Sequence, residues 1–388
     1  GELTKTILEN KEYLENKNNI VIKDVMKKNP ISIKPNEKIS NAIKLMNRKK
    51  INMLPVHEKK LFIGMLQKKL LLQYEFDSPT LLKNQEKLKY EDRIIGNYHS
   101  GETGKTIILM CGIHGNELSG KKALKKMFNY LENNKIDVRG NIIGIQGNLK
   151  AIEKKERYID IDLNRIWKKN IINEIKKGKI KDQHEYKELK KIHEIIDIII
   201  KKKNKKNIII IDLHNTSSAS GLFSVINNTK DLKIASAIKI PIITKLFSKV
   251  KGSFSQYYNS KNISTIVFEG GAIGDPASIY NHEMGIFRIL EKIKIIKKED
   301  VPDFIGKKLT TNNDNNTYKV KYIHQISEND NFLMKPNVTN FQVIKKGEIL
   351  GYDNNGDVLS PFDGKILMPL YQEQGNEGFY IIQNEKVK

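Results

Sequence analysis

Short apolar runs alternate with longer helical segments between residues 81 and 301, and this alternation limits the fold more than any other feature of the sequence. The runs are continuous rather than alternating in polarity, which is typical of strands in a sheet that helices cover on both faces. We therefore predict an α/β domain built on a mixed sheet. In such sheets, ligands bind just beyond the carboxyl ends of the strands. The runs cover residues 106–110, 141–145, 207–211, 221–226 and 264–268, and the clearest helical segments cover 118–131, 187–201 and 276–296.

Polar residues follow three of these runs, at the positions where a binding site is expected. His114 and Glu117 follow the first run, His214 follows the third, and Glu269 ends the last. Polar residues at strand ends are common, so any one of them alone could be a loop residue. Because all of them fall at the same edge of the expected sheet, the sequence predicts one shared site.

Two histidines and one glutamate can hold a catalytic zinc ion and leave one coordination position open. His114, Glu117 and His214 supply that set, for one zinc per chain. Zinc lowers the pKa of water towards neutrality, but a base must still accept the proton of the attacking water. Glu269 is the candidate for that base.

Arginine is scarce in this lysine-rich chain, and two of the six arginines lie in the segment 157–165. A chain that uses lysine for most positive charge is expected to keep arginine where a planar, two-pronged group is needed. Arg157 is the candidate cation for a developing oxyanion. Asn164 with Arg165 can bind a substrate carboxylate.

The motifs at residues 112–117, 157–158, 162–165 and 212–216 resemble, in the same order, those of the succinylglutamate desuccinylase/aspartoacylase family. These are zinc amidohydrolases related to the metallocarboxypeptidases, and the resemblance covers about residues 90 to 388. It implies a zinc-carboxypeptidase-like fold and the ligand, base and arginine roles given above. A looser match at 376–380 implies that Tyr380 completes the active site. The implied reaction is hydrolysis of the linear amide of a small N-acyl amino acid, which yields a carboxylate and a free amine.

One position departs from the family. Aspartoacylases carry a second substrate-binding arginine shortly before the catalytic glutamate, and the corresponding segment 257–261 contains none. The second carboxylate of an acylaspartate then has no partner unless Lys251 or Lys261 substitutes. A neutral or basic N-acyl amino acid, such as an acylated diamino acid, is therefore expected in place of N-acetylaspartate or N-succinylglutamate.

Residues 1–78 are predicted to form a separate α+β module that resembles a cystathionine-beta-synthase-type (CBS) module. Such modules work in pairs and often bind adenine nucleotides. A single copy is present, so pairing would need a second chain, which predicts a homodimer. Gln67 and Leu70 stand where the family has its ribose-binding Thr and Asp, and this favours packing over nucleotide binding. The predicted helix covers 40–49, and the predicted strands cover 52–56 and 60–66.

The expected catalytic domain covers residues 79–301, and an Asn-rich linker at 311–317 leads into a small β domain. Turn-forming sequences divide residues 302–388 into short strands. We expect this domain to cap the active site.

The formal net charge of +23 comes mostly from lysines spread along the whole chain. Arginine-rich patches interleaved with aromatic residues, which nucleic-acid recognition favours, are missing from the sequence. No stretch has the apolar length of a membrane span, and the single cysteine, Cys111, fits a reducing compartment. We therefore expect a cytoplasmic protein that binds neither nucleic acid nor membrane.

Two other functions fit the same residues. A carboxypeptidase-like peptidase would use the same zinc site, and a C-terminal domain that narrows the entrance would argue against it. A non-catalytic metal-binding sensor would use the CBS-like module for signalling. The sequence leaves open the acyl group, the amino acid and whether the N-terminal module regulates anything.

Overall fold

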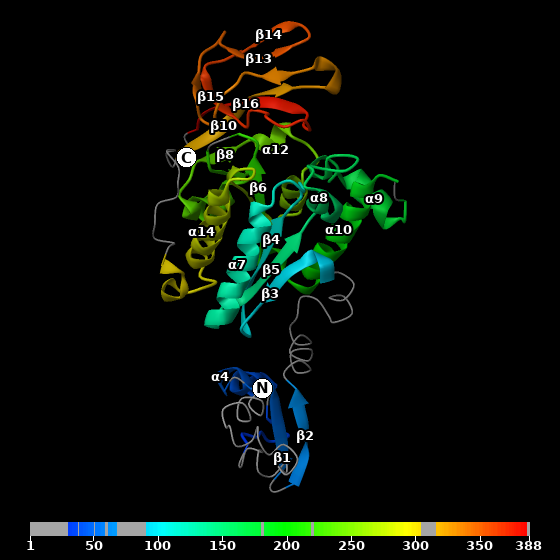
Figure 1. Cartoon of the computed structure of the whole chain (residues 1–388), viewed down its shortest axis with the longest axis vertical. Coiled ribbons are helices and arrows are strands. Elements are labelled where there is room, and N and C mark those ends of the chain that lie inside the picture. Colours follow the sequence, from blue (N-terminus) through cyan, green and yellow to red (C-terminus); the bar gives the residue numbers. More distant parts are fainter. Residues whose placement is uncertain are drawn as a thin grey trace, which may run out of the picture. The chain divides into compact units, whose positions relative to one another are not determined.

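The computed structural model describes residues 30–37, 39–49, 51–58, 61–67, 91–179, 182–218, 221–303 and 316–385. The chain divides into two compact units, Gly1–Leu88 and Lys89–Lys388 (Figure 1). The predicted boundary after residue 78 lies outside the described residues, as does most of the expected linker at 311–317. None of the described helices is both long and apolar enough to cross a membrane.

The described part of the N-terminal unit contains one helix and one hairpin, as predicted. The helix α4 (Ile39–Lys49) precedes the antiparallel strands β1 (Met53–Glu58) and β2 (Leu61–Gln67). Ala42, Met46 and Leu54 form its small buried core. Gln67 is exposed at the end of β2, and Leu70 lies outside the described residues.

The second unit is built around a sheet of eleven strands in the order β12-β15-β16-β10-β8-β7-β9-β6-β4-β5-β3 (Figure 1). The central strands β5, β4, β6 and β9 run parallel, whereas β3 and β7 run antiparallel to their neighbours β5 and β9. The predicted mixed sheet is therefore confirmed. The strands up to β9 are β3 (Ile94–Tyr98), β4 (Glu102–Cys111), β5 (Arg139–Gln146), β6 (Ile208–Thr216), β7 (Phe223–Ile226), β8 (Ile242–Thr244) and β9 (Ser264–Ala272).

Both faces of the central sheet are buried. On β4, Leu109 belongs to a large apolar core shared with α7 (Ser119–Asn134) and α14 (Pro276–Lys292). Its neighbours Ile108 and Met110, which point to the opposite face, are also fully buried. The remaining helices of this unit are α8 (Leu149–Lys154), α9 (Lys169–Lys176), α10 (His184–Lys202), α11 (Leu232–Ala235), α12 (Leu246–Lys249) and α13 (Phe254–Asn259).

The strands after residue 302 form two groups. Four of them, β10, β16, β15 and β12, continue the main sheet, because β10 pairs in parallel with β8. The other three, β11, β13 and β14, form a separate small sheet. The predicted domain boundary at residue 301 stays a prediction, because β8 precedes this residue, β10 follows it, and the two strands are hydrogen-bonded to each other. These strands are β10 (Thr317–Gln325), β11 (Leu333–Met334), β12 (Val343–Ile344), β13 (Ile349–Asp353), β14 (Gly356–Leu359), β15 (Gly364–Leu367) and β16 (Glu377–Asn384).

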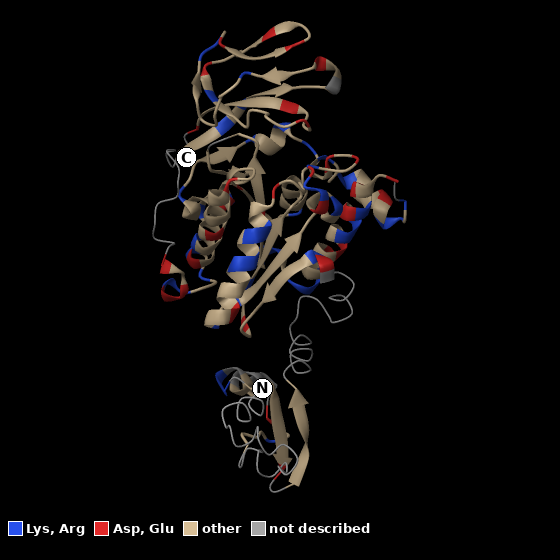
Figure 2. Cartoon of the chain, viewed as in Figure 1, with Lys and Arg blue, Asp and Glu red and all other residues tan. Residues whose placement is uncertain are grey.

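Positive charge is spread over the described residues rather than gathered on one element. Lysines and arginines lie on α7, α9 and α10, and acidic residues lie among them on α9 and α10 (Figure 2). This distribution agrees with a solvated lysine-rich surface.

Candidate active site

The register of the parallel strands brings the predicted site residues to one edge of the sheet. On β6 and β9, His214 and Glu269 are direct partners, so their Cα atoms lie side by side. His114 lies three residues beyond the end of β4, the neighbour of β6 on the other side. The turn that places it needs glycine at residue 115, because a Cβ there would lie 2.0 Å from the carbonyl carbon of Ala151.

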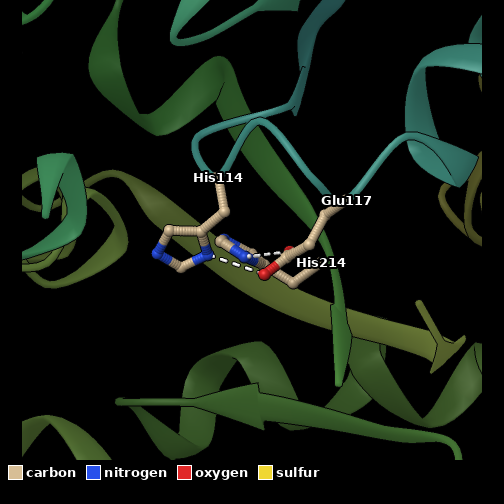
Figure 3. A group of neighbouring side chains, drawn as sticks. All are labelled: His114, Glu117 and His214. Atoms are coloured by element: carbon tan, nitrogen blue, oxygen red, sulfur yellow. Dashed lines mark hydrogen bonds and ion pairs between the residues drawn. The ribbon is translucent and has the colours of Figure 1, made fainter. Parts of the chain in front are cut away.

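The predicted ligands form one buried cluster. His114 and His214 both turn towards the carboxylate of Glu117, as Figure 3 shows. His114 Nδ1 lies 2.7 Å from Glu117 Oε1, and His214 Nδ1 lies 2.9 Å from Glu117 Oε2. One atom from each residue lies within 4.8 Å of the others, which is close enough for all three to share one ion.

A second carboxylate lies behind each histidine. Asp162 Oδ1 is 3.2 Å from His114 Nε2, and Asp212 Oδ1 is 3.1 Å from His214 Nε2. The hydroxyl of Ser255 donates to the other oxygen of Asp212 at 2.8 Å. A carboxylate on the far ring nitrogen is the usual companion of a metal-bound histidine, since it fixes the ring and its tautomer. Asp212 is thus placed to orient His214.

The electrostatics of the cluster favour a bound cation. Burial alone would raise the pKa of Glu117, but His114 and His214 lower it below the usual range. Burial opposes charge on His214 as well, yet Asp212 and Glu117 raise its pKa well above the ordinary value. The Glu117 carboxylate is thus ionised and needs positive charge nearby, which either a protonated histidine or a metal ion can supply.

Glu269 and Arg157 line the same cavity as the cluster. Burial raises the pKa of Glu269 to about 8, and the charges of Glu117 and Asp212 act in the same direction. Glu269 Oε2 and Arg157 Nε are buried without a hydrogen-bond partner among the described residues. The guanidinium of Arg157 is held by Asp162 at 3.2 Å and lies 3.6 Å from Glu117.

Asn164 and Arg165 also line the cavity, but a residue from a distant strand already contacts the arginine. Glu377 on β16 accepts hydrogen bonds from Arg165 Nε at 3.2 Å and from Nη2 at 2.7 Å. The side-chain oxygen of Asn164 accepts from the backbone N–H of Phe254. Tyr380, on the same strand as Glu377, is buried and lines the cavity as well.

The cavity has a volume of about 120 Å³ and two different sides. The ligand cluster and the arginines make up the polar side. Val225, Phe247 and Val267 belong to the apolar side, and all three are buried in one core cluster. Among the described lining residues the cations are Arg157 and Arg165, and neither Lys251 nor Lys261 is among them. The segment 257–261 lies elsewhere: its Tyr257 and Tyr258 pack against Trp167.

Sequence reasoning missed two residues of this site. Asp162 lies in the matched motif 162–165 without a predicted role of its own; it accepts from the backbone N–H of Asn164, and it also holds His114 and Arg157. Glu377 lies within the looser C-terminal match at 376–380, which also holds Tyr380, yet its pairing with Arg165 depends on how β16 is placed. Cys111 is a buried packing residue, and burial raises the pKa of its thiol to about 12.

The sequence matches two family models. Residues 103–291 match the succinylglutamate desuccinylase/aspartoacylase catalytic domain, and residues 22–75 match the CBS domain. Residues 103–291 therefore form a domain of the succinylglutamate desuccinylase/aspartoacylase catalytic type, and it is accompanied by a CBS domain. Both predicted resemblances are confirmed.

Individual proteins with these two names are also similar to this chain in sequence. A succinylglutamate desuccinylase of Pseudomonas putida is 37% identical over 68 residues, which cover 18% of this chain and 20% of that protein. The chain thus aligns with about a fifth of that relative's length. A probable aspartoacylase of Prochlorococcus marinus is 27% identical over 281 residues, covering 69% of this chain and 88% of the relative.

Solved structures support the fold. The succinylglutamate desuccinylase of Vibrio parahaemolyticus superposes with a TM-score of 0.56 at 16% identity, over 75% of this chain and 86% of that one. A succinylglutamate desuccinylase/aspartoacylase of Rhodobacter sphaeroides gives 0.55 at 16% identity, over 73% and 87%. At this identity the similarity concerns the fold alone.

Proposed function

We propose that this protein is a zinc-dependent deacylase that hydrolyses the amide of a small N-acyl amino acid. The observation that carries the proposal is the arrangement of the two histidines. Each directs Nδ1 to the shared carboxylate of Glu117 and Nε2 to a second carboxylate, Asp162 or Asp212. Two imidazoles and one carboxylate suit zinc, and the two outer carboxylates supply the support that such ligands need.

His114, Glu117 and His214 would hold the metal. A zinc ion held there would act as a Lewis acid and would lower the pKa of water. Glu269 in its ionised form accepts a proton from the attacking water and returns it to the leaving amine. Arg157 points its guanidinium towards the cluster and donates to the oxyanion that forms on the acyl carbon. The C–N bond then breaks, and the products are a carboxylate and a free amine.

The cavity favours a substrate with one carboxylate. Arg165 with Asn164 is the site for that group, which would displace Glu377 from the guanidinium or share the guanidinium with it, and Tyr380 lines the same cavity. A second carboxylate placed against Val225, Phe247 and Val267 would find no cation among these three side chains, and the two arginines of the lining are assigned to the oxyanion and the first carboxylate. Burying an unpaired carboxylate is strongly unfavourable. We therefore propose a neutral or basic N-acyl amino acid as the substrate rather than an acylated dicarboxylic amino acid.

The C-terminal residues that line the cavity argue against a peptidase. Residues Met368, Leu370 and Gln372 of the C-terminal segment line the cavity together with the ligand cluster. The side chain of Asn116 donates to Gln372 at 3.1 Å, which ties this segment to the metal-binding loop. A cavity bounded in this way favours small substrates over an extended peptide.

The test is amine release from a panel of N-acyl amino acids, with and without a chelator. The panel pairs N-acetyl derivatives of neutral and basic amino acids with N-acetylaspartate and N-succinylglutamate. We expect hydrolysis of a neutral or basic member, its loss with chelator and its recovery with added zinc. Hydrolysis that persists after chelation, or zinc-loaded protein that releases no amine from any member, would contradict the proposal.

We also propose that the CBS domain pairs with a second copy of this chain. One domain is matched, and Leu61, Phe62 and Ile63 on β2 are at least half exposed. Sedimentation of the full chain would reveal the dimer, and charged substitutions at Phe62 and Ile63 should shift it towards monomer. A monomeric wild type at micromolar concentration would contradict the pairing.

A further inference from the structure

A buried carboxylate outside the cavity holds the backbone of the segment that carries the site arginines. Glu185 is the second residue of α10, and none of it is exposed to solvent. Three successive backbone N–H groups, those of residues 159–161, donate to its two oxygens. The distances are 2.7 Å from Ile159, 3.1 Å from Asp160 and 3.2 Å from Ile161.

Two further bonds complete this arrangement. The side chain of Asn148, which is also fully buried, donates to Glu185 at 2.8 Å and caps the start of α8 with its oxygen. In the opposite direction, the backbone N–H of His184 donates to the carboxylate of Asp160 at 2.6 Å. The loop and the first turn of α10 therefore hold each other through reciprocal bonds.

Only an ionised carboxylate satisfies these four donors. It accepts at both oxygens, whereas a glutamine amide would turn its NH₂ group against N–H groups that also donate. The position in the first turn of α10 favours negative charge as well, because the helix dipole is positive there. A loop with no regular backbone ladder thus gains a fixed shape from a single side chain.

The held segment lies between the functional residues. Arg157 is two residues before it, and Asp162 directly follows it. The bonds of Asp162 to His114 and Arg157, and the bond of the Gly115 N–H to the carbonyl of Arg157, connect the loop to the ligand cluster. A shift of residues 159–161 should therefore move Arg157 and Asp162 as well.

We propose that Glu185 is a positioning residue for catalysis, which sets Arg157 and Asp162 against the metal-binding cluster through the backbone of residues 159–161. The inference rests on the deacylase function proposed above. A displacement of about 1 Å at a catalytic group costs about 10²-fold in rate, so Glu185→Gln should lower kcat/KM by about that factor. Most of the loss should fall on kcat, since Arg157 acts on the oxyanion.

Glu188 provides a matched control on the same helix. It too is a buried carboxylate, which pairs with Arg93 at 2.7 Å and with His184 at 3.2 Å and accepts from the backbone N–H of Leu149. Among the described residues it makes no direct hydrogen bond or ion pair with residues 159–161, so it is linked to them only through His184. Both variants, Glu185→Gln and Glu188→Gln, are assayed at a temperature at which each remains folded. Glu185→Asp, which keeps the charge on a shorter side chain, should lose less activity than Glu185→Gln and keeps the test valid if the amide variant folds poorly.

Three readouts separate positioning from general destabilisation. In Glu185→Gln the backbone amides of residues 159–161 should exchange at least about tenfold faster, also in metal-free protein, whereas in Glu188→Gln they should not. The zinc content should stay unchanged. In an Arg157→Ala background, Glu185→Gln should cost clearly less than in the wild type, because one of the two groups that it positions is already absent.

Two results would overturn the proposal. One is a folded Glu185→Gln protein with kcat/KM within about threefold of wild type. The other is an equal loss of kcat/KM in Glu188→Gln. A wild-type protein that releases no amine would instead contradict the deacylase function, so the two failures are distinguishable.

Discussion

On one side of the cavity, His114, His214 and Arg157 are each fixed by a carboxylate, whereas on the other side Val225, Phe247 and Val267 are fixed by apolar packing alone. Directional bonds place individual atoms, and apolar packing shapes a volume without placing any one atom. The polar side should therefore control the chemistry, and the apolar side should control only which groups fit. Substitutions on the polar side should then have much larger effects on turnover.

The largest effect is expected at Glu269. Replacing the base in Glu269→Gln removes the proton acceptor and should lower kcat by about 10²–10⁴-fold. The side chain is not one of the three ligands, so zinc should remain bound. The measurement is kcat together with metal content, and undiminished turnover would rule out Glu269 as the base.

The second largest effect on turnover is expected at Arg157. In Arg157→Lys the charge stays but the fork to Asp162 and towards the cluster is lost, and kcat should fall by about 10²–10³-fold. Steady-state kinetics should show a smaller change in KM. A variant impaired only in KM would show that Arg157 binds the substrate and does not stabilise the oxyanion.

The outer carboxylates should act on the metal. Asp212→Asn keeps the shape next to His214 but removes the charge, and zinc affinity should weaken by about 10–100-fold. A competition titration with a chelating dye measures this. An unchanged dissociation constant would show that Asp212 supports the strand and not the ligand.

Zinc binding should also depend on pH. In the metal-free site, Asp212 and Glu117 raise the pKa of His214 well above its ordinary value, against the effect of burial. At neutral pH this histidine therefore carries a proton that zinc must displace. Affinity should rise by about tenfold per pH unit for each proton released and fall as the pH is lowered. Calorimetry in buffers of different ionisation enthalpy would detect that proton, and no release would contradict the raised pKa.

The smallest effect is expected on the apolar side. Val225→Ala removes two carbon atoms, worth about 1.6 kcal/mol of apolar contact, so kcat/KM should fall by no more than about 15-fold. Zinc content should not change. If Val225→Ala lowered kcat/KM as much as Arg157→Lys, the apolar side would control turnover as strongly as the polar side, which would contradict this comparison.

The sequence predicted the part of the site that follows from strand ends. Each of His114, His214 and Glu269 comes just after or at the end of a continuous apolar strand, and parallel strands bring such positions together. Helices and strands could be distinguished because apolar residues recur at different spacings in the two. The bounds differ by a few residues, as for α10, which begins at His184 rather than at residue 187.

The contacts made by loops could not be predicted in this way. Asp162 and Glu185 act through a loop without regular periodicity, and Glu377 reaches Arg165 from a strand more than two hundred residues further along the chain. The pairing of β10 with β8 has the same origin, because turn sequences divide strands but do not say which strands become neighbours. Such contacts depend on the tertiary fold.

The most direct test of this account is a zinc titration into chelator-treated protein, comparing wild type with His214→Ala. His193→Ala is the matched control, because His193 is also buried but bonds to Tyr258 outside the cluster. We predict about one zinc per chain for wild type and for His193→Ala, and no tight binding for His214→Ala. Equal binding by His214→Ala, or no binding by wild type, would contradict a metal site at His114, Glu117 and His214.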